Sequence, residues 1–220
     1  MNDHELARKL ARETGTLLIG LRNHAASLSG GEDETHSVLA EEVLGSEGDR
    51  VAHDYLMDQF SIHRPSDVLL SEEGDLEVAR LNAARVWIID PLDGTAQYST
   101  SGDDFAVHIA LWEASSPNPS QISVASVAVP ARNELWSMDE PVQRYQPNNT
   151  PIRILVSRSR PPREIPAVIK KLEEAFPERG PVEVIPMGSV GAKVGAILAD
   201  KADVYFNSVQ PGNVEQVIGG

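Results

Sequence analysis

Apolar residues in the first part of the chain recur at helical spacing. From about Asp3 to His24, leucines fall three, four or seven positions apart, which predicts an amphipathic helix that Asn2 or Asp3 can cap. The leucines of this face are Leu6, Leu10, Leu17, Leu18 and Leu21. A loop rich in serine, glycine and acidic residues is expected from Ala26 to Glu34.

A second stretch of helical spacing begins at about Gly48 or Asp49 and ends at Ile62, just before the helix-stopping pair Arg64-Pro65. Its inward-facing residues are expected to be Val51, Tyr55, Leu56 and Phe60. Beyond this helix, the apolar run at 68–70 predicts a short strand, and 76–84 predicts a short helix.

The pattern then changes to that of strands. Val86–Ile89 is a continuous apolar run rich in β-branched residues, which is typical of a buried strand. Apolar runs at 105–113, 122–129 and 134–138, separated by turns rich in Pro, Asn and Ser, predict an antiparallel sheet. Glu140–Pro151 carries three prolines and two asparagines and is the candidate domain boundary.

Strands and helices alternate beyond this boundary, which predicts an α/β layer. The expected elements are strands at Ile152–Val156, Val182–Ile185 and Val204–Phe206, with helices at Pro162–Phe176 and Gly191–Leu198. Lys170 and Lys171 are expected on a solvated helix face. The prediction is therefore an N-terminal α+β domain at 1–146 and a partial C-terminal α/β domain at 147–220.

Composition narrows the classes of function. A chain of 220 residues can bury a core as one domain or as one and a fraction. Its net charge of −14 argues against binding nucleic acid polymers, although bound cations can still attract a small phosphorylated substrate. The absence of cysteine excludes disulfides and thiolate chemistry. Because no signal peptide or membrane-length apolar run is found, we expect a cytoplasmic protein without a membrane partner.

The candidate chemistry is concentrated directly after the buried strand. Asp90-Pro91-Leu92-Asp93-Gly94-Thr95 is interpreted as a rigid turn. Pro91 fixes the backbone there, and Gly94 permits an angle that bulkier residues resist. Two carboxylates held side by side repel each other unless a cation lies between them. The turn therefore predicts a cation site.

Glu72 adds a third carboxylate just past the end of the preceding predicted strand. If both strands lie in one sheet, Glu72, Asp90 and Asp93 converge at one edge, and such oxygen ligands favour Mg²⁺ or Mn²⁺. Two such ions about 3.5–4 Å apart can activate a water and stabilise the leaving oxygen of a phosphate ester. Glu73 could equally be a solvated turn residue, and His108, in the middle of a strand, is interpreted as structural.

Three other motifs do not fit the sequence. In phosphatases that form a phospho-aspartate, the two acids are two positions apart, whereas here they are three apart with a proline between them. The alternating ligands of an EF-hand are absent from the 90–95 segment. The Gly188 segment lacks the Gly-Lys-Ser/Thr ending of a P-loop.

Leu70-Ser71-Glu72-Glu73 and Asp90-Pro91-Leu92-Asp93-Gly94-Thr95 together resemble the lithium-sensitive, Mg²⁺-dependent phosphatase superfamily of inositol monophosphatase and fructose-1,6-bisphosphatase. The resemblance is closer to its 3'(2'),5'-bisphosphate nucleotidase branch, the CysQ type of bacterial sulfate assimilation. It covers residues 3–206, with further support from 44–49, 99–111 and 188–193. It implies an α/β (α+β) fold, a layered αβαβα sandwich of the sugar-phosphatase type, here with an incomplete C-terminal layer.

The resemblance implies which residues bind the metal. Glu72, Asp90 and the Leu92 carbonyl would hold the Mg²⁺ that activates the attacking water. Asp90 would bridge to a second Mg²⁺, which Asp93 would also bind. Two or three Mg²⁺ ions are therefore expected.

It also implies which residues act on water and substrate. Thr95, together with Glu72, would orient and help deprotonate the water, and Asp49 would assist a further metal or water. The backbone N–H groups of Gly94 and Thr95 would hold the scissile phosphate, in line with anion binding at a helix start.

Gly188, Ser189 and Lys193 resemble the nucleotide end of the site. A glycine-led turn at a helix start offers free N–H groups, and Lys193 adds a positive charge for a second phosphate. The alternative is that Gly188 and Gly191 only allow close helix packing.

The chain departs from the family pattern after its last predicted strand. The family supplies another metal ligand there, in a Trp-Asp-x-Ala segment, whereas 207–220 contains no Trp-Asp pair and Glu215 is its only carboxylate. We therefore expect weaker binding of the second metal, and an exposed sheet that lowers stability or favours a homodimer. The ending is interpreted as a frameshift or early stop, which the gene sequence past codon 220 would test.

The functional hypothesis is Mg²⁺-dependent hydrolysis of the 3'-phosphate of 3'-phosphoadenosine 5'-phosphate, or of its 5'-phosphosulfate, by water activated by two metals. Inositol monophosphate and fructose 1,6-bisphosphate are the alternative substrates. A hypothesis of another class is a truncated, inactive homologue that binds only metal or nucleotide.

Overall fold

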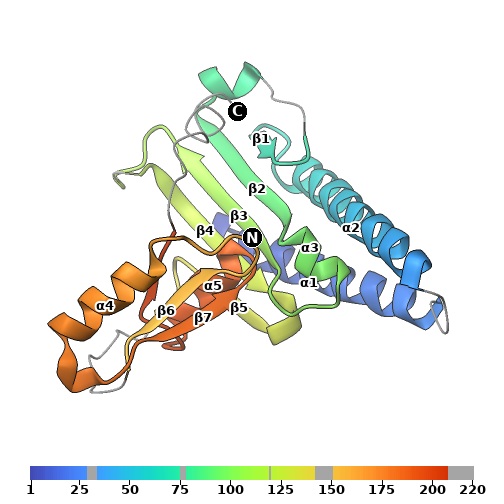
Figure 1. Ribbon diagram of the computed structural model, residues 1–220. Helices are drawn as coiled ribbons and strands as arrows, with labels where there is room; N and C mark the ends of the chain where they lie inside the picture. The colour runs from blue at the N-terminus through green and yellow to red at the C-terminus, as the bar shows by residue number, and fades with distance from the viewer. Residues whose placement is uncertain (29–33, 75–77, 119, 142–150, 208–220) are drawn as a thin grey trace. The chain divides into compact units, whose positions relative to one another are not determined.

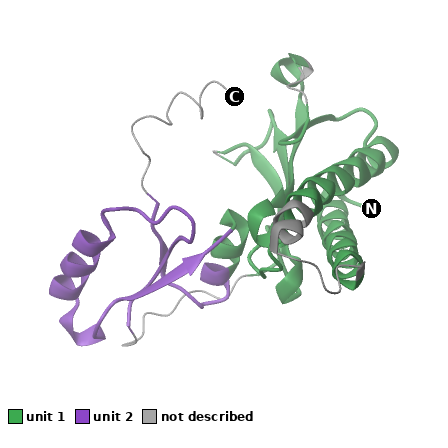
Figure 2. Ribbon diagram, turned by 45° about the vertical axis from the view of Figure 1, so that its right-hand side comes forward, with its two compact units in different colours: residues 1–142, 189–195 green, residues 143–188, 196–220 purple. Residues whose placement is uncertain are grey.

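The computed structural model describes residues 1–28, 34–74, 78–118, 120–141 and 151–207. The chain forms two compact units, which Figure 2 shows in different colours. Unit 1 consists of residues 1–142 and 189–195, and unit 2 consists of 143–188 and 196–220. Unit 1 therefore includes a short segment from far along the chain. The expected boundary at 146/147 lies outside the described residues.

Unit 1 is built on a five-stranded sheet with the order β1-β2-β3-β4-β5. β1 runs parallel to β2, and the other neighbours are antiparallel. The sheet confirms the short strand predicted before the buried one and the three antiparallel runs predicted after it. The strands are β1 (Val68–Ser71), β2 (Arg85–Asp93), β3 (Ala106–Glu113), β4 (Ile122–Val129) and β5 (Glu134–Ser137).

Two long helices, α1 (Asp3–Leu28) and α2 (Glu34–His63), lie side by side along one face of this sheet (Figure 1). α1 starts with a reciprocal cap: the Glu5 N–H donates to Asn2 Oδ1 at 2.8 Å, and the Asn2 N–H donates to Glu5 Oε2 at 2.9 Å. Asn2 is thus the capping residue, one of the two candidates from the sequence.

The core of unit 1 lies between these helices and the sheet. Leu6, Leu10 and Leu18 of α1 are completely buried, as are Leu56 and Phe60 of α2. The Phe60 ring packs on Trp87 of β2, with ring centroids 4.9 Å apart. The helical spacing therefore predicted the buried face correctly, while the other expected inward residues are only half-buried: Leu17, Leu21, Val51 and Tyr55.

The predicted start of the second helix was wrong. α2 begins at Glu34 and runs through Gly45 and Gly48, and α1 continues to Leu28 into the expected loop. Glycine weakens an isolated helix, which is why the sequence favoured a start at Gly48. In the fold, a Cβ on Gly48 would lie 2.6 Å from Tyr98 Cε1, so glycine lets the helix approach the site closely.

Unit 2 contains a three-stranded parallel sheet with the order β7-β6-β8. β6 is central, and Ile154, Leu155 and Val156 are buried in it. The expected strands and helices are confirmed with ends shifted by one to three residues. The elements of unit 2 are β6 (Arg153–Ser157), α4 (Ile165–Ala175), β7 (Glu183–Met187) and β8 (Val204–Tyr205), while α5 (Val190–Leu198) begins in unit 1 and ends in unit 2.

Smaller elements complete the described chain. The short helix expected at 76–84 is a 3₁₀ turn at Val78–Asn82, and further 3₁₀ turns lie at Pro130–Arg132 and Pro177–Arg179. The expectations about Glu215 and the chain ending lie outside the described residues. No helix in the described segments is long and apolar enough to cross a membrane.

Asp3 should stabilise unit 1 through two arginines. Its carboxylate accepts hydrogen bonds from Arg64 Nε at 2.7 Å and from Arg85 Nη2 at 2.9 Å. Burial alone would raise the pKa of Asp3, but the two arginines lower it below its usual value. Because Asp3 is partly exposed, we expect Asp3→Asn to lose about 0.5–1 kcal/mol of unfolding free energy at pH 7.

This loss should depend on pH. A carboxyl whose pKa is lowered on folding adds stability above its unfolded pKa near 3.8, and that stability is lost as the pH falls through the folded value. Urea unfolding should therefore show a difference between Asp3→Asn and wild type at pH 7 that shrinks at pH 3. Asp54→Asn, whose carboxylate is exposed, is the control. A difference that grew toward low pH would contradict this assignment.

Candidate metal and phosphate site

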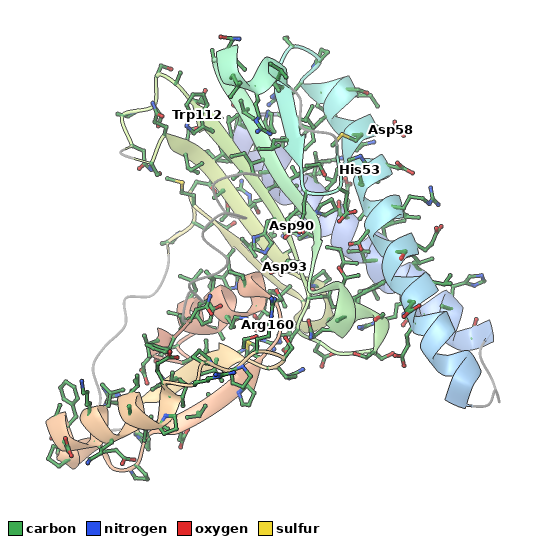
Figure 3. All side chains as sticks on the ribbon, turned by 45° about the horizontal axis from the view of Figure 1, so that its top comes forward. His53, Asp58, Asp90, Asp93, Trp112 and Arg160 are labelled. Atoms are coloured by element: carbon green, nitrogen blue, oxygen red, sulfur yellow. The ribbon has the colours of Figure 1, made fainter. Side chains whose placement is uncertain are left out.

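The two aspartates lie in a bulged strand rather than in a turn. β2 continues through Pro91 to Asp93, and its register pairs Asp90 with His108 and Asp93 with Ala106. Three steps along β2 thus oppose two along β3, which is a β-bulge. Without the extra residue, side chains three apart would point to opposite faces. The bulge places Asp90 and Asp93 on the same face (Figure 3).

Glu72 joins Asp90 from the neighbouring strand. The Glu72 N–H donates to the Ile89 carbonyl at 3.2 Å, which fixes the end of β1 beside β2. The two carboxyl groups lie close together, and burial, followed by the charge of Glu72, raises the pKa of Asp90 to about 7. Two carboxyl groups in this arrangement need a proton or a cation between them. The structure therefore brings Glu72 and Asp90 together, as predicted.

Asp93 is held by three donors on one oxygen. Asp93 Oδ2 accepts from Ser189 Oγ at 2.6 Å, from the Gly191 N–H at 2.8 Å and from His108 Nε2 at 3.1 Å. Burial would raise the pKa of Asp93, but these hydrogen bonds, above all that of His108, lower it below its usual value. Because an ionised carboxylate can only accept, His108 Nε2 carries the proton in this arrangement.

Close packing of the start of α5 against β3 allows Ser189 and Gly191 to reach Asp93. A Cβ on Gly191 would lie 2.5 Å from His108 Nε2 and 2.6 Å from Ala106 Cβ, so only glycine lets the helix approach β3. Ser189 also accepts from the Ala192 N–H at 3.0 Å and thus caps the helix. Ser189, expected at the nucleotide end, therefore contacts Asp93, and Gly191 allows the close helix packing that was the alternative for the glycines of this segment.

His108 is the residue whose place in the site was missed. It was interpreted as structural because a histidine in the middle of a strand is usually part of the packing. Its pairing with Asp90 places it on the face that carries both aspartates. Burial lowers the pKa of His108, but the bond and charge of Asp93 raise it above its ordinary value overall. Side chains alternate between the two faces of a strand, so a known pairing of one residue in 105–113 with β2 would have placed His108 on the face of the aspartates.

Thr95 lies between α2 and the bulge. Its hydroxyl is 3.3 Å from Asp49 Oδ1 and 3.2 Å from the Leu92 carbonyl oxygen, and it can donate to either. Burial, followed by the charge of Glu73, raises the pKa of Asp49 to about 6. The structure thus brings together Asp49, Leu92 and Thr95, to which the family resemblance had assigned roles toward metal or water.

Gly94 is required by its backbone conformation. It precedes the short helix α3 (Thr95–Ser99) with φ of +93°, in the left-handed region that other residues resist. A Cβ there would lie 2.8 Å from the Asp104 carbonyl oxygen. The Gly94 carbonyl accepts from the N–H groups of Gln97 and Tyr98, so the earlier N–H groups of the turn have no partner within the helix.

The donor set fits a hard divalent cation. Asp90, Asp93 and His108 each have one possible ligand atom, and these three atoms lie within 4.8 Å of one another, but His108 Nε2 cannot bind a cation while it donates its proton to Asp93. The closeness of Glu72 and Asp90 is a second sign, because a cation would offset both the burial and the Glu72 charge that raise the pKa of Asp90. The carboxylate oxygens favour Mg²⁺ or Mn²⁺. An imidazole ligand would favour Zn²⁺ or another transition metal instead.

Gly188 and Lys193 are the two expected substrate contacts that the structure does not place among the carboxylates. Gly188 is buried after the end of β7 and belongs to unit 2. Lys193 lies in α5 within unit 1 and is only 4% exposed, so it is not a free surface cation. Their roles toward a substrate remain predictions.

Comparisons with known proteins identify a family that matches most of the chain. The model of the inositol monophosphatase family matches residues 3–212. A 3'-phosphoadenosine 5'-phosphate phosphatase of Mycobacterium bovis is 41% identical over 169 residues, which cover 75% of this chain and 60% of that protein. The protein of the same name from Mycobacterium leprae is 36% identical over 215 residues, 94% of this chain and 72% of the relative.

A solved structure agrees at the level of the fold. CysQ from Bacteroides thetaiotaomicron, described as a bacterial member of the inositol monophosphatase family, matches with a TM-score of 0.68 and 22% identity. The match covers 92% of this chain and 78% of that one. With the family match over nearly the whole length, these findings show that the chain belongs to the inositol monophosphatase family.

Proposed function

We propose that this protein is a Mg²⁺-dependent phosphomonoesterase that removes the 3'-phosphate from 3'-phosphoadenosine 5'-phosphate, or from its 5'-phosphosulfate, with water as the nucleophile. The observation that carries the proposal is that Asp90 lies close both to Asp93 on its own strand and to Glu72 of the neighbouring one, with the Thr95–Asp49 pair just beyond the bulge. The names of the mycobacterial relatives support the substrate class. Because the match spans 60% of the M. bovis relative, the activity of the whole relative is inferred for this chain only as a proposal.

Glu72, Asp90, Asp93 and the Leu92 carbonyl are the groups that would hold Mg²⁺. When bound, Mg²⁺ would neutralise phosphate charge and make a water more acidic. The protein's contribution is to keep these oxygens close together at the end of β2. The bulge does this for the two aspartates, and the Glu72 turn supplies the third carboxylate from β1.

The Thr95–Asp49 pair provides a path for the proton of the attacking water. The Thr95 hydroxyl can pass its proton to Asp49 Oδ1, 3.3 Å away, while it accepts one from the water. Burial and the charge of Glu73 raise the pKa of Asp49 to about 6, which suits a group that takes up a proton near neutral pH. The oxygen of the water then bonds to phosphorus as the bond from phosphorus to the ester oxygen breaks, and that oxygen takes a proton from solvent and leaves as a hydroxyl.

The N–H groups at Gly94 and Thr95 are the proposed donors to the scissile phosphate, because they precede the first bonded turn of α3. Gly188, Ser189 and Lys193 are proposed to serve the nucleotide end. Of these three, Ser189 already contacts Asp93, and it would couple that end to the metal ligands.

The test is phosphate release from 3'-phosphoadenosine 5'-phosphate with Mg²⁺ and with EDTA. The proposal predicts release that requires Mg²⁺ and exceeds release from inositol monophosphate and fructose 1,6-bisphosphate. A preference for either of those two substrates would overturn the substrate assignment. No Mg²⁺-dependent release from any of the three would favour a homologue that only binds metal or nucleotide.

Thr95→Val should slow the reaction without unfolding the protein. Valine keeps the shape but removes the hydroxyl that links water to Asp49, and general-base assistance contributes roughly 10²–10⁴-fold. We expect kcat to fall by about a hundredfold or more, with little change in KM. Steady-state kinetics measure this, and Thr100→Val, at the other end of α3, is the control. A kcat equal to wild type would exclude Thr95 from the proton path.

A further inference from the structure

Glu72 and Glu73 are the two central residues of a tight turn after β1. The Ser71 carbonyl accepts from the Gly74 N–H at 3.2 Å and closes this turn. Glu72 and Glu73 are both exposed, whereas Ser71 is only 7% exposed. The position of the Glu72 carboxylate therefore depends on how firmly the two ends of the turn are held.

Repulsion between carboxylates destabilises the position of the Glu72 side chain. The Glu72 carboxyl contacts Asp90, and the charges of Glu73 and Glu72 both act on Asp49 of α2. Without a cation, these carboxylates repel one another, and the repulsion pushes the turn away from α2 and β2. A contact that keeps the turn in place must come from a group without negative charge.

His53 makes that contact. Its Nδ1 lies 2.9 Å from Ser71 Oγ, a hydrogen bond between α2 and the last residue of β1. At the other end of the turn, a Cβ on Gly74 would lie 3.5 Å from His53 Cε1, so the imidazole also lies against Gly74. Figure 3 shows His53 on α2, on the side of the helix that faces the site. One side chain is thus hydrogen-bonded to the first residue of the four-residue turn and lies near the last.

The spacing along α2 links this contact to Asp49. Residues four apart lie on the same face of a helix, so Asp49 and His53 are neighbours on α2. Asp49 reaches Thr95, and His53 reaches Ser71. α2 therefore fixes the proton acceptor and the Glu72 turn relative to each other over a single helical turn.

We propose that His53 is a positioning residue that, through its hydrogen bond to Ser71, holds the Glu72 turn in the geometry needed to bind a divalent cation. This inference rests on the metal site of the proposed function. His53 contacts neither of the aspartates in the bulge. Its effect on the reaction is exerted through Ser71 and the turn.

The experiment measures cation binding without substrate. Mn²⁺ is titrated into the protein and followed by electron paramagnetic resonance, for wild type, His53→Ala, Ser71→Ala and the double variant. Loss of a group that orients a metal ligand typically costs about 10–100-fold in metal affinity, so each single variant should bind Mn²⁺ at least about tenfold more weakly. The double variant should bind no more weakly than the weaker single variant, because both substitutions break the same bond.

Two further variants separate positioning from a general loss of fold. His53→Asn keeps a polar side-chain atom near the position of Nδ1 and should restore most of the Mn²⁺ affinity. His63→Ala removes a histidine from the last turn of the same helix and should leave the affinity unchanged. Failure of His53→Asn to restore binding, or equal weakening by His63→Ala, would overturn the proposal.

The outcome is distinct from that of the phosphatase assay. Wild-type affinity in both His53→Ala and Ser71→Ala would overturn the role of His53 and leave the phosphatase proposal standing. Weakened Mn²⁺ binding in both variants, with no phosphate release by wild type, would support the role of His53 and overturn the phosphatase. Absence of Mn²⁺ binding by wild type would overturn both.

Discussion

Asp90→Asn should abolish Mg²⁺-dependent phosphate release and, at the same time, make the metal-free protein more stable. Asp90 is half-buried, and burial together with the charge of Glu72 raises its pKa to about 7. At pH 8 the carboxylate is ionised, and its burial near Glu72 lowers the free energy of unfolding. Asparagine keeps the shape without the charge. We expect unfolding free energy to rise by about 1–2 kcal/mol, roughly 2–8 °C in Tm for a chain of this size.

The loss of activity should be much larger. Removing a charged ligand forfeits several kcal/mol of transition-state stabilisation, which corresponds to about a thousandfold or more in kcat/KM. Phosphate release with Mg²⁺ and thermal unfolding in EDTA, both at pH 8, measure the two effects. Asp103→Asn, an exposed aspartate on the loop before β3, should change neither. A variant that lost both activity and stability would show that Asp90 supports the fold instead of a cation.

Gly94→Ala should lower the stability of the protein strongly, for two independent reasons. The backbone there has φ of +93°, which costs a residue with a Cβ about 1–2 kcal/mol. The new methyl group would also meet the Asp104 carbonyl oxygen at 2.8 Å, a backbone atom that cannot turn aside. We expect a total loss of about 2–4 kcal/mol.

The same change should reduce catalysis in the protein that remains folded. Gly94 separates Asp93 from Thr95, and a displacement of about 1 Å at such a point can cost roughly a hundredfold in rate. Urea unfolding and single-turnover phosphate release measure the two losses. The matched control is Gly20→Ala in α1, where nothing lies within 4 Å of the added methyl group. That variant should gain about 0.5–1 kcal/mol, because alanine favours a helix. Equal losses in both variants would contradict the steric argument.

The local sequence predicted most of the elements and the carboxylates of the site. Helical spacing identified the buried leucines of α1, and apolar runs identified the strands, because both signals depend on neighbours within one turn or one strand. Glu72 and Asp90 were recognisable because each follows directly on the apolar run of a predicted strand, and Thr95 because it follows a glycine. The family pattern added Asp49, which the structure places beside Thr95.

What the sequence could not show depends on pairing between distant segments. The 90–95 segment looked like a turn, since a proline usually interrupts a strand. Whether Pro91 lies in a bulge is decided by the register with β3, which no local pattern encodes. The same register brings His108 into the site. Gly48 likewise suggested a helix start. Glycine is needed inside the helix there because the Tyr98 ring, from a distant segment, packs against it, and the local sequence does not show this contact.

The return of residues 189–195 to unit 1 also has a consequence for biosynthesis. Asp93 leaves the ribosome 96 residues before Ser189, its hydrogen-bond donor. At translation rates of 5–20 residues per second, that interval lasts roughly 5–20 seconds. During this time the nascent chain contains Asp90 and Asp93 but lacks the serine and the Gly191 N–H that hold Asp93 in place. A cation that binds the nascent chain early meets looser ligands than it meets in the finished protein.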